Sequence, residues 1–120
     1  MTVLIVDDCE PMRRLIKSLI SGVADAIVEC GSGGAAYAAY EAHRPDWVLM
    51  DIQSPGLDGI AATGQIRAAF PDARILIVST YGDEPLRAAA RTAGACGYVL
   101  KENLLEVRRR LEAPCKTSNE

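Results

Sequence analysis

Short apolar runs alternate with helix-like segments five times along this chain, and this alternation restricts the fold more than any other feature. The runs have the length of buried strands, and no linker, repeat or low-complexity stretch separates the units. Strand-helix alternation of this kind predicts parallel β-α units with helices on both faces of one sheet. The sequence therefore predicts an α/β fold with a five-stranded, parallel, doubly wound sheet. The apolar runs are residues 3–6, 26–30, 47–50, 75–78 and 97–100.

The segments between these runs carry helix signals. Pro11 suits an early helical position, and apolar residues then recur at helical spacing until Gly22. Four further helices are expected at about residues 35–42, 60–70, 84–93 and 104–111. The polar end, residues 113–120, is predicted to be a flexible tail. Residues 1–112 would then form one domain, as a chain of 120 residues allows.

Composition excludes several classes of function. The net charge is −3 and no basic block is present, so neither nucleic acid nor an anionic membrane is an expected partner. The four cysteines form no C-x-x-C pair and His43 is the only histidine, which argues against a zinc site. No stretch approaches the roughly 20 apolar residues of a membrane span, and the start has no basic leader. The expected location is the cytoplasm.

Polar residues that can carry chemistry follow four of the apolar runs. Because the carboxyl ends of parallel strands meet at one edge of an open sheet, where such folds place their ligand sites, these residues are expected to share a pocket. They are Asp7, Asp8, Asp51, Ser79 and Lys101.

The adjacent carboxylates Asp7 and Asp8 indicate a divalent cation. Two carboxylates at a strand end repel each other, and a bound cation would neutralise them. Oxygen ligands favour Mg²⁺ over Zn²⁺, and Mg²⁺ keeps several waters in a site with few protein ligands. The alternative is that the pair only caps the following helix, since Asp is a favoured capping residue.

Asp51 follows the most continuously apolar run and could be a metal ligand, a general base or a nucleophile that accepts a phosphoryl group. Lys101 could pair with the resting carboxylate and stabilise negative charge on a transferring phosphoryl group. Ser79 offers a hydroxyl that could donate to a phosphoryl oxygen, a role for which Thr80 competes. The alternative for either hydroxyl is a hydrogen bond to nearby backbone.

In this order, these motifs resemble the receiver domains of response regulators from two-component systems, which have a flavodoxin-like fold. The likeness runs from Val3 to about Leu111. The matching features are the acidic pair Asp7-Asp8, the phospho-acceptor position Asp51, an Asp-x-x-x-Pro-x-x-x-Gly loop at residues 51–59, the switch hydroxyl Ser79, the switch aromatic Tyr98 and the lysine Lys101.

The resemblance implies a site and a function. Asp8, Asp51 and the backbone carbonyl of Gln53 would hold Mg²⁺, with Asp7 acting through bound water. Asp51 would take a phosphoryl group from a sensor histidine kinase or a phosphotransfer protein, so the chain would be a phosphorelay switch rather than a conventional enzyme. Ser79 would then move toward the phosphoryl group, and Tyr98 would turn inward.

The same resemblance implies a partner surface. The turn of Tyr98 would change the face formed by the fourth helix, the last strand and the fifth helix, which would bind a downstream protein target. Coupling of this kind typically amounts to about 1–3 kcal/mol. The chain is expected to be a monomer or a weak, phosphorylation-dependent dimer.

Two other interpretations remain open within the resemblance: a receiver-like module that binds its partner without phosphorylation, and the excised receiver of a DNA-binding regulator. A haloacid dehalogenase-type phosphatase is disfavoured, because it needs a second aspartate where Gln53 stands. Glu102 follows Lys101 where the family often has proline. A cis bond before a residue other than proline costs about 2.5–4 kcal/mol, which favours the trans form, but the sequence leaves the choice open.

Overall fold

The computed structural model describes residues 1–52 and 59–112, and the strands in this part of the chain form one five-stranded parallel sheet in the order β2-β1-β3-β4-β5. This arrangement confirms the predicted doubly wound α/β fold. The strands are β1 (Thr2–Val6), β2 (Ala26–Cys30), β3 (Trp47–Met50), β4 (Ile75–Ser79) and β5 (Gly97–Leu100).

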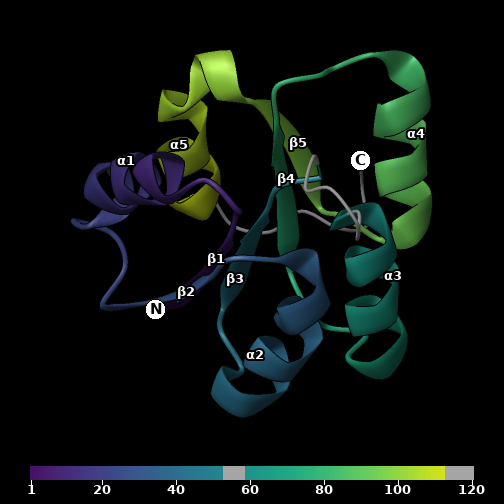
Figure 1. Cartoon of the computed structure of the whole chain (residues 1–120), viewed down its shortest axis with the longest axis horizontal. Coiled ribbons are helices and arrows are strands. Elements are labelled where there is room, and N and C mark those ends of the chain that lie inside the picture. Colours follow the sequence, from purple (N-terminus) through teal and green to yellow (C-terminus); the bar gives the residue numbers. More distant parts are fainter. Residues whose placement is uncertain (53–58, 113–120) are drawn as a thin grey trace.

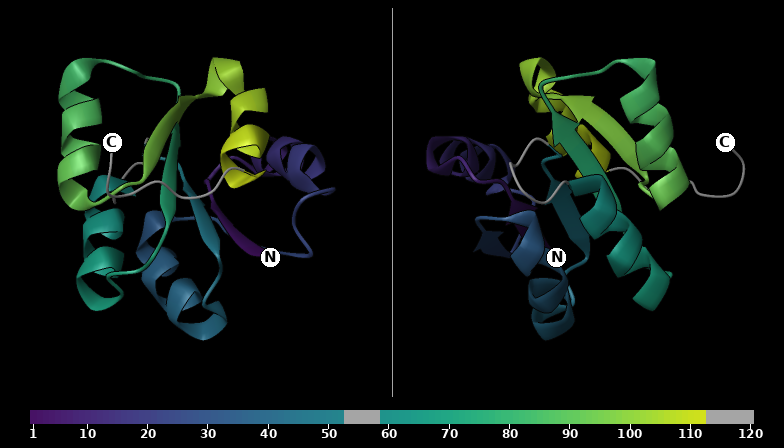
Figure 2. Two further views of the ribbon diagram at one scale, coloured as in Figure 1. Left: turned by 180° about the vertical axis from the view of Figure 1, so that it is seen from behind. Right: turned by 45° about the vertical axis from the view of Figure 1, so that its right-hand side comes forward.

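Helices cover both faces of the sheet. Helices α1 and α5 lie side by side on one face, and α2, α3 and α4 cover the other (Figure 1). The two views in Figure 2 show the same division. The helices are α1 (Glu10–Ile20), α2 (Ala36–His43), α3 (Gly59–Ala69), α4 (Glu84–Ala93) and α5 (Leu105–Glu112), with short 3-10 helices η1 (Gly33–Ala35) and η2 (Lys101–Asn103).

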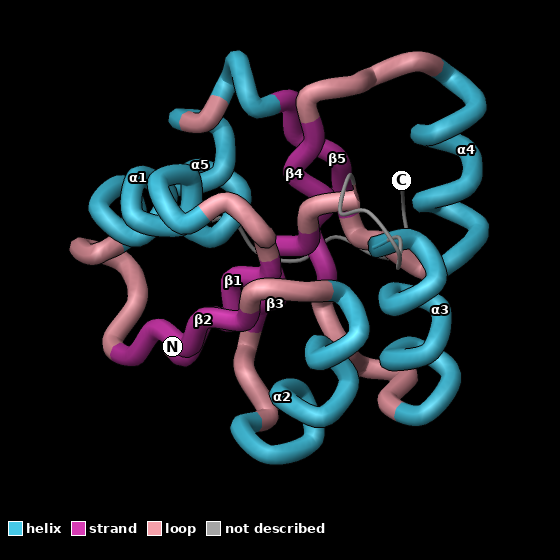
Figure 3. Tube along the Cα trace, viewed as in Figure 1, coloured by secondary structure: helices cyan, strands magenta, loops and turns pink. Residues whose placement is uncertain are grey.

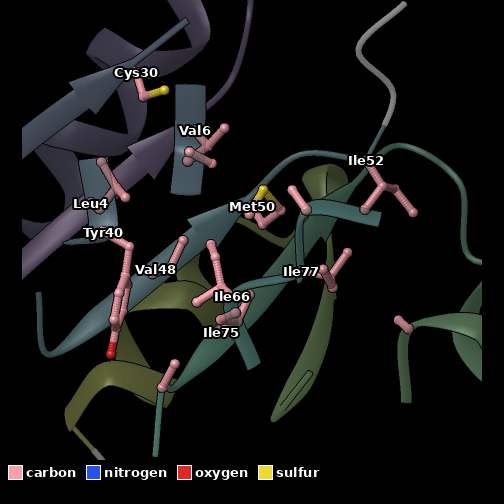
Figure 4. Close-up of a cluster of buried hydrophobic side chains, with 14 residues drawn as sticks. Leu4, Val6, Cys30, Tyr40, Val48, Met50, Ile52, Ile66, Ile75 and Ile77 are labelled. Carbon is pink, nitrogen blue, oxygen red and sulfur yellow. The ribbon is translucent and has the colours of Figure 1, made fainter. Parts of the chain in front are cut away.

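Each face has its own hydrophobic core, which explains why the strands are apolar throughout rather than alternating. Successive residues of β1 and β3 point to opposite faces, so Leu4 and Val48 pack toward α2 and α3, whereas Ile5 and Leu49 pack toward α1 and α5. Figure 4 shows the core beneath α2, α3 and α4. All residues of β3 and β4 are buried, as expected of interior strands covered on both faces.

The alternation of strand and helix is visible along the coloured part of the trace in Figure 3. The predicted element bounds hold to within about two residues, with local exceptions. Helix α2 continues to His43 because Arg44 supplies a left-handed cap with φ 45°. Ser79 is the last residue of β4 rather than the residue after it.

The region after β5 contains a short helix that was not predicted. Lys101 opens this helix, η2, and α5 then begins at Leu105, one residue from its predicted start. No cis peptide bond occurs in the described part of the chain, so the bond before Glu102, left open by the sequence, is trans. The predicted flexible tail at residues 113–120 lies outside the described residues.

No helix within residues 1–52 and 59–112 is both long enough and apolar enough to span a bilayer.

Candidate functional site

Three carboxylates meet at the carboxyl edge of the sheet. Asp7 and Asp8 follow β1, Asp51 follows β3, and these two strands are neighbours. One oxygen from each of the three side chains lies within 4.8 Å of the others. Asp7 and Asp51 are buried, whereas Asp8 is exposed. The predicted convergence of these acids is therefore found, and the exposed member leaves the cluster open to solvent.

Backbone hydrogen bonds beyond the strand ends place the acids. The Asp51 amide donates to the Val6 carbonyl at 2.9 Å, and the Asp7 amide donates to the Cys30 carbonyl at 3.1 Å. The sheet ladder thus continues for one residue past each strand. As a result, backbone hydrogen bonds of the sheet fix the positions from which the Asp7 and Asp51 carboxylates project.

The pair Asp7-Asp8 does not occupy the capping position of α1. The N-cap residue is Cys9, which makes no side-chain capping bond. Asp7 Oδ1 instead accepts a hydrogen bond from the Cys9 amide at 2.8 Å, which ties this carboxylate to the turn before the helix. Helix capping alone therefore does not account for the second carboxylate, Asp8.

Lys101 follows the edge strand β5 and extends from there into the carboxylate cluster. Its Nζ lies 3.1 Å from Asp7 Oδ2 and 3.6 Å from Asp51 Oδ1, and its side chain is only 14% exposed. Because β4 lies between β5 and β3, the long lysine side chain has to pass over one strand end. The ammonium partly neutralises two buried negative charges.

Asp7 Oδ2 has spare capacity to bind a ligand. It is buried and has no hydrogen-bond partner in the described part of the chain, since the contact with Lys101 is an ion pair without hydrogen-bonding alignment. The Lys101 ammonium compensates part of the charge on this buried oxygen, which still has a lone pair available for a metal cation. Oxygen donors grouped in this way fit Mg²⁺. Gln53, predicted to add its backbone carbonyl, lies outside the described residues.

Ser79 lies next to the acids along the sheet and is fully buried, whereas its competitor Thr80 is exposed. Ser79 Oγ accepts a hydrogen bond from the Tyr81 amide at 3.1 Å. The Tyr98 hydroxyl in turn donates to the Tyr81 carbonyl. The expected backbone interaction of Ser79 is thus present, and the same backbone residue connects Ser79 with Tyr98.

Tyr98 is partly exposed and is held by a cation. The guanidinium of Arg87, on α4, stacks over its ring at 4.7 Å from the ring centroid. Arg87 Nε also donates to the Gly82 carbonyl at 2.8 Å. These contacts hold the aromatic side chain between α4 and the β4-α4 loop, on the face of the sheet that α2, α3 and α4 cover.

A groove of about 690 Å³ lies beside the acidic cluster rather than over it. Leu15 and Leu19 of α1 line one part, and Tyr98 and Arg87 line another. Lys101 is the only one of the candidate site residues Asp7, Asp8, Asp51, Ser79 and Lys101 that also lines this groove. The groove therefore runs between the site and the surface around η2 and α5.

Sequence reasoning missed a second group of charges beside the acids. Arg13 and Lys17 of α1 both bond to Glu29 on β2, and these hydrogen bonds, Lys17 first, lower the pKa of Glu29 below its usual range. A signal was available in the sequence. Two cations four residues apart on one helix face repel each other, so a carboxylate partner was to be expected.

The geometry first defines a class of protein. It is a doubly wound α/β domain with three clustered carboxylates and a largely covered lysine at the carboxyl edge of its sheet. Residues 3–111 match the model of the response regulator receiver domain. The chain belongs to this family, whose members act as signalling switches rather than as conventional enzymes.

Similar proteins agree with this assignment. The chemotaxis protein CheY of Bacillus subtilis is 37% identical over 118 residues, covering 98% of this chain and 97% of that protein. The oxygen regulatory protein NreC of Staphylococcus haemolyticus is 34% identical, covering 84% of this chain but 48% of that protein. The chain is thus similar to a relative of about its own length and also to one of which it spans about half the length.

Solved structures of response regulators and CheY also superpose on this chain. CheY in a CheX-CheY-BeF3-Mg²⁺ complex from Borrelia burgdorferi superposes with a TM-score of 0.86 at 27% identity, covering 92% of this chain and 86% of that one. A LuxR-family two-component response regulator from Aurantimonas gives 0.83 at 33% identity, covering 98% and 89%.

Proposed function

We propose that this receiver takes a phosphoryl group on Asp51 in a Mg²⁺-dependent reaction and thereby switches a protein partner. The observation that carries the proposal is the pairing of Lys101 with both Asp51 and Asp7 inside the carboxylate cluster. This arrangement provides a nucleophile, a cation site and a fixed positive charge in one pocket. The donor would be a sensor histidine kinase or a phosphotransfer protein.

The chemistry follows from the placement of these groups. An oxygen of Asp51 attacks the phosphorus of a phosphohistidine, the P–N bond breaks, and the histidine nitrogen leaves with the electron pair and takes up a proton. Mg²⁺ held by Asp8, Asp51 and the Gln53 carbonyl, with Asp7 acting through water, would neutralise phosphoryl oxygens. Lys101 keeps its positive charge beside the reacting oxygen, where a preorganised charge contributes most.

The signal would leave the pocket through Ser79. A phosphoryl oxygen on Asp51 would accept a hydrogen bond from the Ser79 hydroxyl, and the shift of Ser79 toward it would pull on the loop whose Tyr81 amide now donates to the same hydroxyl oxygen. Movement of this loop would release the Tyr98 hydroxyl from the Tyr81 carbonyl and let the ring turn inward. The face formed by α4, β5 and α5 would then bind the downstream target. Residues 1–112 would form this switching unit, as a monomer or a weak phosphorylation-dependent dimer.

Phosphorylation is tested by incubation with Mg²⁺ and acetyl phosphate, followed by intact mass. We expect a phosphoryl mass gain for the wild type and none for Asp51→Asn. Asp46→Asn is the matched control, since Asp46 is an exposed aspartate directly before the same strand. Mass is preferable to tryptophan emission because Trp47 begins β3, at the end of the strand away from Asp51.

The outcomes separate the alternatives. Wild-type labelling of Asp51→Asn would refute the role of Asp51. A folded wild type that takes up no label from acetyl phosphate, or from a phosphorylated histidine kinase, would instead favour a receiver-like module that binds its partner without phosphorylation.

A further inference from the structure

Arg13 is the only side chain among the described residues that hydrogen-bonds the backbone of the acidic pair. Its Nη1 donates to the Asp7 carbonyl at 2.6 Å. This carbonyl belongs to the planar peptide that joins Asp7 to Asp8, so its direction determines where the Asp8 residue starts. The Arg13 side chain is only 18% exposed, which limits competition from water for this bond.

Glu29 fixes the other side of the Arg13 fork. Arg13 Nε donates to Glu29 Oε1 at 3.0 Å, while Lys17 Nζ lies 2.9 Å from Glu29 Oε2. The Arg13 guanidinium therefore bridges the edge strand β2 and the backbone beyond β1. The rigid, planar fork of arginine suits such a two-sided contact, which the single point charge of lysine cannot reproduce.

The remaining bonds at Asp7 come from the backbone. The Cys30 carbonyl accepts from the Asp7 amide, and the Cys9 amide donates to the Asp7 carboxylate. These bonds hold the amide and the side chain, but not the carbonyl that leads to Asp8. Asp8 is exposed, and among the described residues no side chain other than Arg13 hydrogen-bonds the peptide group that contains its backbone nitrogen.

We propose that Arg13, anchored by Glu29, is a positioning residue that orients the Asp7-Asp8 peptide and thereby sets the affinity of the site for Mg²⁺. This inference rests on the proposed Mg²⁺ site. Residues that orient metal ligands without touching the metal typically change affinity about 10- to 100-fold when they are replaced. We expect a loss near the lower limit, about tenfold, because Asp7 keeps its other two bonds.

A simple charge argument predicts the opposite sign. Removal of a cation near a carboxylate cluster strengthens the attraction of the cluster for Mg²⁺. Arg13→Gln should therefore bind Mg²⁺ more tightly if only charge matters, and more weakly if Arg13 orients the peptide. Arg13→Lys keeps the charge but loses the fork, so any weakening in this variant is an effect of geometry.

The experiment is a Mg²⁺ titration of the full chain followed by ¹H–¹⁵N NMR, with dissociation constants fitted to amides near the acids. The variants are Arg13→Gln and Arg13→Lys. Arg14→Gln is the matched control, because it removes the same charge from the next residue of α1, whose side chain is 72% exposed and bonds only to Glu10 among the described residues. Thermal unfolding in EDTA measures any purely structural effect separately.

We expect both Arg13 variants to bind Mg²⁺ about tenfold more weakly, with Arg14→Gln equal to the wild type or slightly tighter. Wild-type or tighter binding by Arg13→Gln together with wild-type binding by Arg13→Lys would overturn the inference, even if both variants unfolded at lower temperature in EDTA. A wild type that shows no Mg²⁺-dependent shifts would overturn the proposed Mg²⁺ site and this inference with it.

Discussion

Replacement of Lys101 by methionine removes the charge from the pocket while keeping much of the side-chain length. The Lys101 ammonium lies 3.1 Å from Asp7 and 3.6 Å from Asp51. At an effective dielectric constant of about 20, each of these two ion pairs amounts to about 5 kcal/mol of attraction. Desolvation of the lysine offsets part of this energy. Removal of one partner from a buried charge cluster typically costs about 3–5 kcal/mol.

We expect Lys101→Met to lower the free energy of unfolding by about 3 kcal/mol in EDTA at pH 7. The lower end of the range of about 3–5 kcal/mol applies because the lysine side chain is 14% exposed, so water reaches the pocket in part. With a denaturant slope of about 2 kcal/mol per molar urea, the unfolding midpoint should fall by about 1.5 M. Saturating Mg²⁺ should stabilise the variant more than the wild type, since the cation then replaces the missing charge.

Asp51→Asn provides the test of this reasoning. In that background Lys101 has one carboxylate fewer to neutralise, so Lys101→Met should cost about half as much, and the difference is the coupling energy of a double-mutant cycle. Equal costs in both backgrounds, or a cost below about 0.5 kcal/mol in the wild type, would refute the assignment of a stabilising charge cluster.

Two further outcomes follow from contacts near the site. Gly59→Ala should destabilise the protein by about 1–3 kcal/mol in urea unfolding, because the added Cβ would lie 2.4 Å from the Asp51 carbonyl oxygen, and a wild-type midpoint would contradict this contact. The hydrogen bonds of Glu29 with Lys17 and Arg13 are the chief cause of its lowered pKa. The Glu29 carboxylate therefore stabilises the fold above pH 4.5, its pKa in the unfolded chain, and this contribution is lost as the pH falls through the lowered pKa of the folded state. The stability difference between the wild type and Glu29→Gln should therefore shrink as the pH falls below 4.5 in acid titrations, and a difference that grows there would contradict the sign.

The sequence predicted the sheet and the shared pocket because both depend on local signals. Apolar runs with strand length reveal buried strands without knowledge of their order, and a parallel sheet brings all carboxyl ends to one edge whatever that order is. This is why the meeting of Asp7, Asp8, Asp51 and Lys101 could be predicted from position alone.

The contacts around the pocket could not be predicted in the same way. The bond from Arg13 to the Asp7 carbonyl depends on the angle at which α1 leaves β1, and no residue pattern encodes that angle. The stacking of Arg87 on Tyr98 likewise joins two elements whose relative position follows from packing rather than from periodicity. Gly59 was seen only as part of a loop motif, whereas its close approach to Asp51 requires the tertiary structure.

The link between Ser79 and Tyr98 passes through the main chain of Tyr81, whose amide donates to one and whose carbonyl accepts from the other. The side chain at this position takes no part in either bond and is 56% exposed. The residue at position 81 can therefore change while the connection itself survives almost any replacement. Proline is the exception, because it alone lacks the amide hydrogen that Ser79 accepts.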